Sequence, residues 1–259
     1  MSAPQIFDFD ARTLKKARSC QSFLFDIIKQ NLQERLGIIK KPFTHIKLHA
    51  STPITLDAVS TSSFTYNSAE ILPDNIKEDA ILSFLSLHAV NDIPGLLIQM
   101  KKSLNPDGLF MAALFGGETL TELRQSLMQA ELSLTGGVRP RIFPFMDKQQ
   151  MGALMQRAGF ALPVVDSDTI TINYRHPVKL MHDLREMGET NCLLAREKNF
   201  TRRDLFAEAN RYYMKNFADT DGTVKATFEI IYAIGWAPHE SQQKPLRPGS
   251  GEKSLTEVL

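Results

Sequence analysis

The chain has 259 residues, of which 43% are apolar, so it can bury one large core. A formal net charge of +1 does not favour nucleic acid or an anionic membrane as a partner. The longest apolar run, residues 109–115, is too short to span a bilayer, and the first residues contain no signal-peptide core. Cys20 and Cys192 have no paired spacing. These features predict a cytoplasmic protein without a transmembrane segment or a metal site.

Residues 1–43 are predicted to form a helical segment ahead of the main domain. Apolar side chains recur at helical spacing over residues 19–36, at Leu24, Ile27, Ile28, Leu32 and Leu36. Lys15, Lys16 and Arg18 precede this stripe and are interpreted as solvated charges.

The next stretch, residues 44–50, alternates apolar and polar side chains, which predicts a strand with one face in water. His45 and His49 would lie on that wet face. No Cys or carboxylate is spaced to complete a metal site with them, so they are interpreted as surface histidines.

Residues 79–115 predict a strand, a crossover helix and a second strand. "DAILSFLSL" (79–87) and "LFMAALF" (109–115) are apolar on both faces, as buried parallel strands are. Asp92 and Pro94 suit the start of the helix between them. The three elements therefore predict a right-handed βαβ unit.

The second half of the chain predicts further helices and a terminal hairpin. Capping boxes are predicted for two helices, at Thr119 with Glu122 and at Asp147 with Gln150. "TITINY" (169–174) and "ATFEIIYAIGW" (226–236) are assigned to an antiparallel pair, with a helical insertion at 175–224. The main domain then covers residues 44–236. Residues 237–259, rich in proline and glycine, are predicted to be an extended tail.

This order of elements resembles a class I methyltransferase that depends on S-adenosylmethionine (SAM), an α/β fold with a doubly wound, Rossmann-like sheet. "LHAVNDIPGLLIQMKKSLNPDGLFMAALFGGETLTELRQSL", "MGETN" and "GWAPHESQQKPLRPGS" are similar, more narrowly, to the methyltransferase-type assembly factors of respiratory complex I and their bacterial relatives. A more distant resemblance is to the carboxyl methyltransferase of biotin synthesis. The resemblance implies SAM as the cofactor and a protein subunit of complex I as the partner. It also implies arginine hydroxylation, which is credited to the mitochondrial member.

The cofactor motifs of that fold are altered in this chain. Where the fold has a glycine-rich turn after its first strand, the chain reads "ASTPIT", with Ser51, Thr52 and Pro53 in place of the glycines. A later motif survives as "SAEILP", with Ser68 where an acid is usual. Asp57 could contact the ribose only if a helix and a strand preceded it.

Residues 51–78 would have to supply two helices and two strands if the fold were intact. They show no helical periodicity and are rich in Ser and Thr. We therefore predict a shortened N-terminal half of the sheet and weak or absent SAM binding. The alternative is that one strand has been assigned to the wrong stretch.

The candidate site is expected at the carboxyl ends of the parallel strands, where ligands of such sheets bind. The remnant of the SAM cleft would be lined by Ser51, Thr52, Ser68, Leu85 and Ser86. His88 is the candidate acid or base, and the alternative is a histidine packed at a strand end. The substrate side would include Asn91, Gly116, Gly117, Glu189 and Asn191.

Two classes of function stay open at this point. One is an enzyme that modifies a protein side chain with SAM or an oxidant. The other is a non-catalytic assembly protein that keeps the fold as a binding surface. A SAM-dependent methyltransferase acting on a small molecule is a third reading.

Overall fold

A computed structural model describes residues 5–20, 22–52, 54, 56, 63–67, 70–72 and 77–243. Within these residues the strands form one six-stranded sheet of order β2-β1-β3-β4-β6-β5. The elements in chain order are α1 (Phe9–Ala17), α2 (Phe23–Ile38), β1 (His45–Ala50), β2 (Ser63–Asn67), β3 (Glu78–Phe84), η1 (Leu87–Ala89), α3 (Ile93–Ser103), β4 (Leu104–Phe115), α4 (Thr121–Thr135), α5 (Lys148–Ala158), β5 (Ala161–Tyr174), α6 (Pro177–Glu186), α7 (Arg203–Phe217) and β6 (Val224–Trp236).

The sheet has a parallel half and an antiparallel half. β1 pairs in parallel with β2 and β3, and β3 pairs in parallel with β4. β6 runs antiparallel to both β4 and β5. The predicted methyltransferase-like sheet with a C-terminal hairpin is therefore confirmed.

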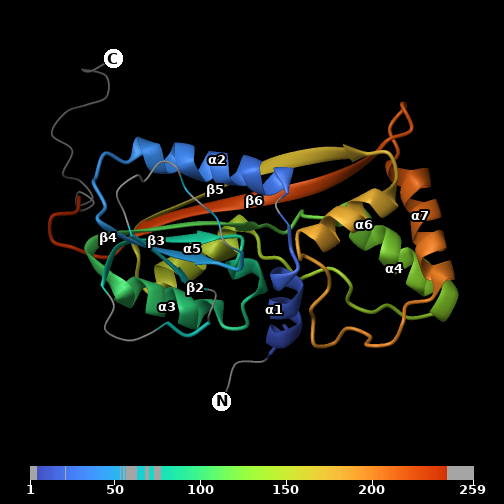
Figure 1. The fold of residues 1–259 in the computed structure, drawn as a ribbon, viewed down its shortest axis with the longest axis horizontal. Coiled ribbons are helices and arrows are strands. Elements are labelled where there is room, and N and C mark those ends of the chain that lie inside the picture. Colours follow the sequence, from blue (N-terminus) through green and yellow to red (C-terminus); the bar gives the residue numbers. More distant parts are fainter. Residues whose placement is uncertain are drawn as a thin grey trace, which may run out of the picture.

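The sheet lies between two layers of helices (Figure 1). One core cluster, on the side of α2, takes Leu109, Met111, Ala113 and Phe115 from β4. The other, on the side of α3 and α5, takes Phe110, Ala112 and Leu114. This alternation follows from the period of two in a strand. The α2 stripe is buried as predicted, except that Ile27 is exposed.

The prediction that β1 has one face in water was wrong. Lys47 and His49 are as buried as the apolar residues between them. Nδ1 of His49 lies 3.2 Å from Oγ of Ser83 on β3, so His49 is not a surface histidine, whereas His45 at the start of the strand is exposed. β1 lies between β2 and β3, and a central strand of a parallel sheet is covered on both faces.

Within the described residues, the first half of the sheet is shorter than a full doubly wound half, which has three strands. Among the described strands, β2 alone lies outside β1. The described residues between these two strands, Ser51, Thr52, Ile54 and Leu56, are not helical. Because β3 pairs on the other side of β1, the strand order reverses between β1 and β3, and this is the topological switch point of the sheet.

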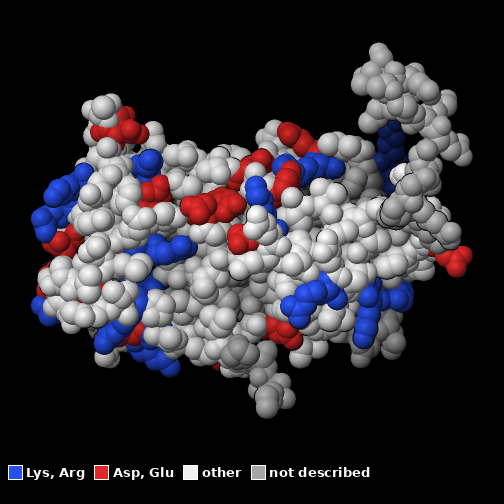
Figure 2. Space-filling model, turned by 180° about the vertical axis from the view of Figure 1, so that it is seen from behind, with Lys and Arg blue, Asp and Glu red and all other residues white. Residues whose placement is uncertain are grey.

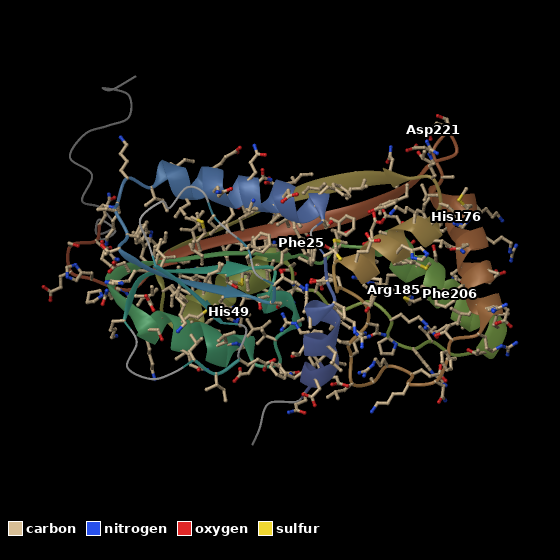
Figure 3. The ribbon with its side chains drawn as sticks, viewed as in Figure 1. Phe25, His49, His176, Arg185, Phe206 and Asp221 are labelled. Atoms are coloured by element: carbon tan, nitrogen blue, oxygen red, sulfur yellow. The ribbon has the colours of Figure 1, made fainter. Side chains whose placement is uncertain are left out.

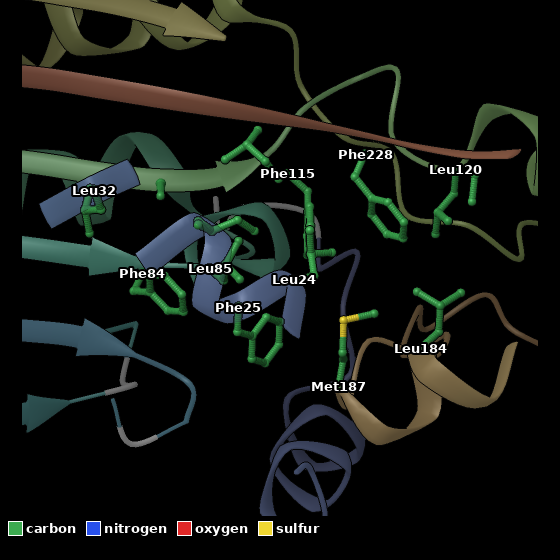
Figure 4. Packing of buried hydrophobic residues seen from close by; sticks show 14 of the residues in the cluster. Leu24, Phe25, Leu32, Phe84, Leu85, Phe115, Leu120, Leu184, Met187 and Phe228 are labelled. Atoms are coloured by element: carbon green, nitrogen blue, oxygen red, sulfur yellow. The ribbon is translucent and has the colours of Figure 1, made fainter. Parts of the chain in front are cut away.

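The β5–β6 hairpin extends past the end of β4 and carries α4, α6 and α7 (Figure 1). β4 ends at Phe115, opposite Ile230, while β6 remains paired with β5 as far as Val224. Leu120, Leu184 and Phe228 pack together where the sheet meets these helices (Figure 4). In Figure 3, Asp221 marks the far end of the hairpin and His49 marks the parallel half of the sheet.

Two helix starts show how far local sequence decides the fold. The predicted capping box of α5 is present, with Asp147 and Gln150 each accepting from the other's backbone N–H. The box predicted for α4 was wrong. Oγ1 of Thr119 donates to the carbonyl of Glu229 on β6, and Glu122 accepts from Thr227. Thr119 and Glu122 therefore bind groups of β6 and do not form the capping box.

Replacing Asp147 by Ala should lower the free energy of unfolding by about 1 kcal/mol, the usual loss for an N-cap acceptor. The N–H of Gln150 would lose its acceptor, which lies 2.7 Å away. Urea unfolding at pH 7 measures the change as a lower midpoint at constant slope. Lys148→Ala is the matched control, because Lys148 is exposed and takes no part in the box. Equal midpoints for the two variants would contradict the prediction.

Candidate functional site at the carboxyl ends of the strands

Helix α1 lies beside the carboxyl ends of the parallel strands (Figure 1). Its N-cap is Asp8, whose side chain accepts from the N–H of Ala11. Arg12 and Lys16 are one turn apart and so share a face of the helix. Both are buried, so the interpretation of Lys16 as a solvated charge was wrong.

The Arg12 guanidinium lies between the ends of β1 and β3. It donates to Oγ of Ser51 at 2.7 Å, to the carbonyl of Ser86 at 2.8 Å and to the carbonyl of Ala89 at 3.0 Å. The two serine hydroxyls are themselves 3.2 Å apart. A cation from α1 thus lies at the topological switch point, bound to groups that follow β1 and β3.

A strained turn at the end of β3 orients the next part of the site. Leu85 has φ of 42°, a left-handed conformation that costs a non-glycine residue on the order of 1–3 kcal/mol. Its N–H donates to the carbonyl of Ala113 at 2.8 Å, and its side chain is buried. These contacts hold the turn, and η1 then carries His88 into the site.

Glu189, in the loop after α6, joins α1 to η1. One carboxylate oxygen pairs with Nζ of Lys16, and the other lies 3.2 Å from Nε2 of His88. The side chains of Lys16, Glu189 and His88 are only 5%, 6% and 0% exposed. The loop can come this close because Gly188 precedes Glu189: a Cβ there would lie 3.0 Å from the carbonyl of Lys15, and its φ is +70°.

The protonation states of this group follow from its burial and its charges. Burial would raise the pKa of Glu189, but Lys16 and His88 hold it well below its usual range. Burial lowers the pKa of Lys16 despite the attraction of Glu189. Burial also lowers the pKa of His88, and Arg12 and Lys16 reinforce that shift against Glu189. At neutral pH Glu189 is therefore ionised and His88 is neutral.

A small cavity lies next to Glu189. Its walls include the rings of Phe115, Phe143, Phe145 and Phe228, and its charged groups are Glu189 and Arg141. The volume is about 20 Å³, room for about one water molecule. The His88 ring packs behind these walls, with its centroid 4.9 Å from that of Phe115. Aromatic faces around a carboxylate are surroundings that suit a cation.

The structure brings together most of the residues predicted for the cofactor and catalytic positions. Ser51 and Ser86 bind Arg12, Leu85 makes the turn, and His88 pairs with Glu189, which was predicted for the substrate side. Thr52 is half-buried next to Ser51. Pro53, Asp57 and Ser68 lie outside the described residues.

The remaining predicted residues support the backbone around the site. Oδ1 of Asn91 accepts from the N–H groups of Ile6 and Phe7, each at 2.8 Å, and so fixes the segment that leads into α1. A Cβ on Gly116 would lie 2.6 Å from the Glu229 carboxylate, so a side chain there would require Glu229 to shift.

Gly117 and Asn191 lie against the segment between α4 and α5. A Cβ on Gly117 would lie 3.9 Å from the carbonyl of Met146, which is ordinary contact. Asn191 donates to the carbonyl of Pro140 at 3.0 Å. Neither residue lines the small cavity, so among the predicted substrate-side residues Glu189 alone reaches it.

Arg12 and Lys16 were missed as site residues. Their spacing placed them on one face of a short helix, but nothing local marked that face as buried. The acid that pairs with Lys16 lies 173 residues further along the chain. A single sequence carries no signal for such a pair.

A family model for the methyltransferase domain matches residues 12–163. The chain belongs to this family. It is 44% identical over 204 residues to "Arginine-hydroxylase NDUFAF5, mitochondrial" of Dictyostelium discoideum, covering 77% of this chain and 47% of that protein. The human protein of the same name is 46% identical over 180 residues, or 70% of this chain and 52% of the relative.

A malonyl-[acyl-carrier protein] O-methyltransferase of Xylella fastidiosa (strain M23) is 36% identical over 174 residues, with 67% of this chain and 57% of the relative covered. The chain thus spans about half the length of the curated relatives that it matches.

The fold is shared with solved methyltransferase structures. Protein BH2331 of Bacillus halodurans C-125, described as a candidate methyltransferase, gives a TM-score of 0.52 at 11% identity, over 80% of this chain and 97% of that one. The YcgJ protein of Bacillus subtilis gives 0.50 at 11% identity, over 82% and 98%. At this identity the likeness shows the fold alone.

Within the described part of the chain, none of the helices has the length and apolar character needed to cross a membrane. The same residues contain no group of three or more His, Cys, Asp or Glu side chains placed to hold a metal ion. Cys20 is exposed and Cys192 is buried, and both are free thiols.

Stability should fall as the pH drops from 7.5 to 5, because of His88. An unfolded histidine titrates near pH 6.5, and the folded pKa of His88 is lower. Between these two values the unfolded chain binds a proton that the folded chain does not. The contribution of the neutral His88 to the free energy of unfolding is therefore fully present above pH 6.5. Below pH 6.5 it is lost, by up to about 1.4 kcal/mol per pH unit.

Urea midpoints across this pH range test the point. His88→Phe keeps an aromatic ring among the phenylalanines and should flatten the decline. His182→Ala, at an exposed position, should keep the wild-type slope. A His88→Phe slope equal to that of the wild type would show that His88 does not control the pH dependence.

Proposed function

We propose that this protein assists the assembly of respiratory complex I by acting on or binding one of its protein subunits, and that it does not use SAM as a methyl donor. The family membership and the identity of 44–46% to proteins named arginine-hydroxylase NDUFAF5 support the first part. The resemblance of "MGETN" and "GWAPHESQQKPLRPGS" to complex I assembly factors points the same way. The observation that carries the second part is the Arg12 guanidinium at the switch point.

The residues at the switch point support the proposal that SAM is not used. The ligand needs a turn without side chains next to its backbone, and Ser51 follows β1 directly. Arg12 already binds Oγ of Ser51 and the carbonyl of Ser86. SAM also carries positive charge on its sulfonium and ammonium groups, which a buried guanidinium repels.

The small cavity supports a cationic side chain as the group that the protein recognises on its partner. Four phenylalanine rings and the ionised Glu189 suit an arginine or lysine, and Arg141 of the same wall is paired with Glu131. At about 20 Å³ the cavity holds only about one water molecule, so the segment with Phe143 and Phe145 has to move before a side chain enters. In this proposal Lys16 holds the Glu189 carboxylate in place for that cation.

A cytoplasmic location is part of the same proposal. It is supported by the two free thiols, because unpaired cysteines are usual in reducing compartments. Fractionation of cells that express the tagged chain tests it, with recovery in the soluble cytoplasmic fraction as the expected outcome.

Calorimetric titration of the full chain with SAM should give a dissociation constant weaker than about 1 mM, or about −4 kcal/mol. Arg12→Ala should not weaken binding further, and Arg18→Ala serves as the exposed control on the same segment. A micromolar dissociation constant that rises on replacing Arg12 would instead make Arg12 an anchor for the SAM carboxylate. That result would refute the second part of the proposal.

Deleting the gene should reduce the amount of assembled complex I, as measured on native gels, and the full chain should restore it. A chain cut after residue 243 should stay folded, because Ala237 and Gln242 still bind Gly108 and Asp107, yet should fail to restore assembly. Thermal unfolding of the truncated chain is the control for folding. Normal complex I in the deletion strain would refute the assembly role.

A further inference from the structure

Two larger cavities are lined in part by residues 139–141. The first, the basic cavity, has a volume of about 260 Å³ and four cationic side chains in its wall, from Lys15, Arg139, Arg141 and Arg196. The second, the apolar cavity, has a volume of about 290 Å³ and an aliphatic floor of Leu127, Met128, Val138 and Ile142. Arg139, Pro140 and Arg141 line both, so the two cavities are neighbours.

The basic cavity carries more positive than negative charge. Its three arginines each have a carboxylate partner, in the pairs Arg139–Glu197, Arg141–Glu131 and Arg196–Asp8. Lys15 is the fourth cation, and its hydrogen bonds go to the carbonyls of Thr190 and Asn191. Four cations against three carboxylates leave one positive charge at this wall.

Of the four cations, Lys15 would be stabilised most by an anion that enters the basic cavity. Burial lowers the pKa of Lys15, and Arg196 lowers it further, against the opposing effects of Cys192 and Asp8. An anion in the cavity would stabilise this partly desolvated ammonium group. A carboxylate could at the same time receive paired N–H groups from an arginine, the geometry that carboxylates favour.

The apolar cavity continues onto an exposed aliphatic surface. Met128 and Val138 are 45% and 46% exposed, and Leu132 and Leu134 further along α4 are exposed as well. Arginine side chains border this surface, from Arg124, Arg139 and Arg141. An occupant that satisfies both cavities needs a carboxylate and aliphatic side chains on one segment.

We propose that the basic and apolar cavities form one docking surface for an acidic segment of a partner protein, with a carboxylate beside Lys15 and an aliphatic side chain over Met128. The inference rests on the proposed function and gives the chemistry of its protein partner. Arg141 also lines the small cavity next to Glu189. A segment bound on this surface would therefore lie beside the candidate site.

The surroundings favour a protein segment over a nucleic acid. The residues that line the two cavities include no aromatic ring, whereas proteins that bind single strands stack the bases on aromatic side chains. On the face drawn in Figure 2, blue and red side chains are interspersed and no continuous basic stripe runs across it. The formal net charge is only +1.

The test uses the full chain and two labelled synthetic peptides, followed by fluorescence anisotropy. One peptide combines Glu and Leu residues, and the other has Gln at every Glu position. The acidic peptide should bind, and Lys15→Met and Arg139→Met should each weaken it about tenfold, the loss of one charge-assisted contact. Arg202→Met is the control, because Arg202 is an exposed arginine paired with Asp204 and lines neither cavity.

Equal binding of the two peptides, or unchanged binding by both cavity variants, would overturn the docking surface. A single-stranded oligonucleotide that binds more tightly than the acidic peptide, with the same sensitivity to Lys15→Met, would also overturn it. The assay contains neither SAM nor complex I. Peptide binding together with normal complex I in the deletion strain would refute the proposed function alone. Reduced complex I in the deletion strain without binding of the acidic peptide would refute the docking surface alone.

Discussion

The buried pair of Lys16 and Glu189 determines how helix α1 meets the loop after α6. The residues are 173 positions apart, and their charges are almost completely removed from water. Removing one partner of such a pair leaves a buried charge without compensation, at a cost of about 3–5 kcal/mol. The pair fixes α1 against the loop after α6. Because Arg12 lies one turn before Lys16 on the same face, the pair also holds the guanidinium between β1 and β3.

Side chains of the short helix α1 thereby reach three separate places in the structure. Arg12 reaches the switch point between β1 and β3, Lys16 reaches the Glu189 carboxylate at the small cavity, and Lys15 reaches the basic cavity. Asn91 and the Arg196–Asp8 pair hold the start of the helix from either side. A small displacement of α1 would disturb all three places together, since one rigid element connects them.

The sequence predicted those parts of the fold whose neighbours lie close along the chain. The β3–α3–β4 unit and the α5 capping box follow from apolar runs and from a cap that its own helix completes. The burial of Lys47 and His49 could not be predicted from the alternation in β1, because it depends on the central place of β1 between β2 and β3 in the folded sheet. Ser51 was placed correctly at the strand end. Its partner Arg12 was not found, because a cation on an isolated short helix is normally solvated.

In the proposed function, the chain itself occupies the place that the methyltransferase fold reserves for a ligand. A bound cofactor stabilises only the folded state and does so in proportion to its concentration. A guanidinium supplied by α1 acts at any concentration, because it is covalently part of the chain. With Arg12 in that place, the turn after β1 does not need glycine. Ser51 can therefore stand there and accept a hydrogen bond from Arg12 directly. Such a fold keeps its surfaces for a protein partner, which is what an assembly role requires.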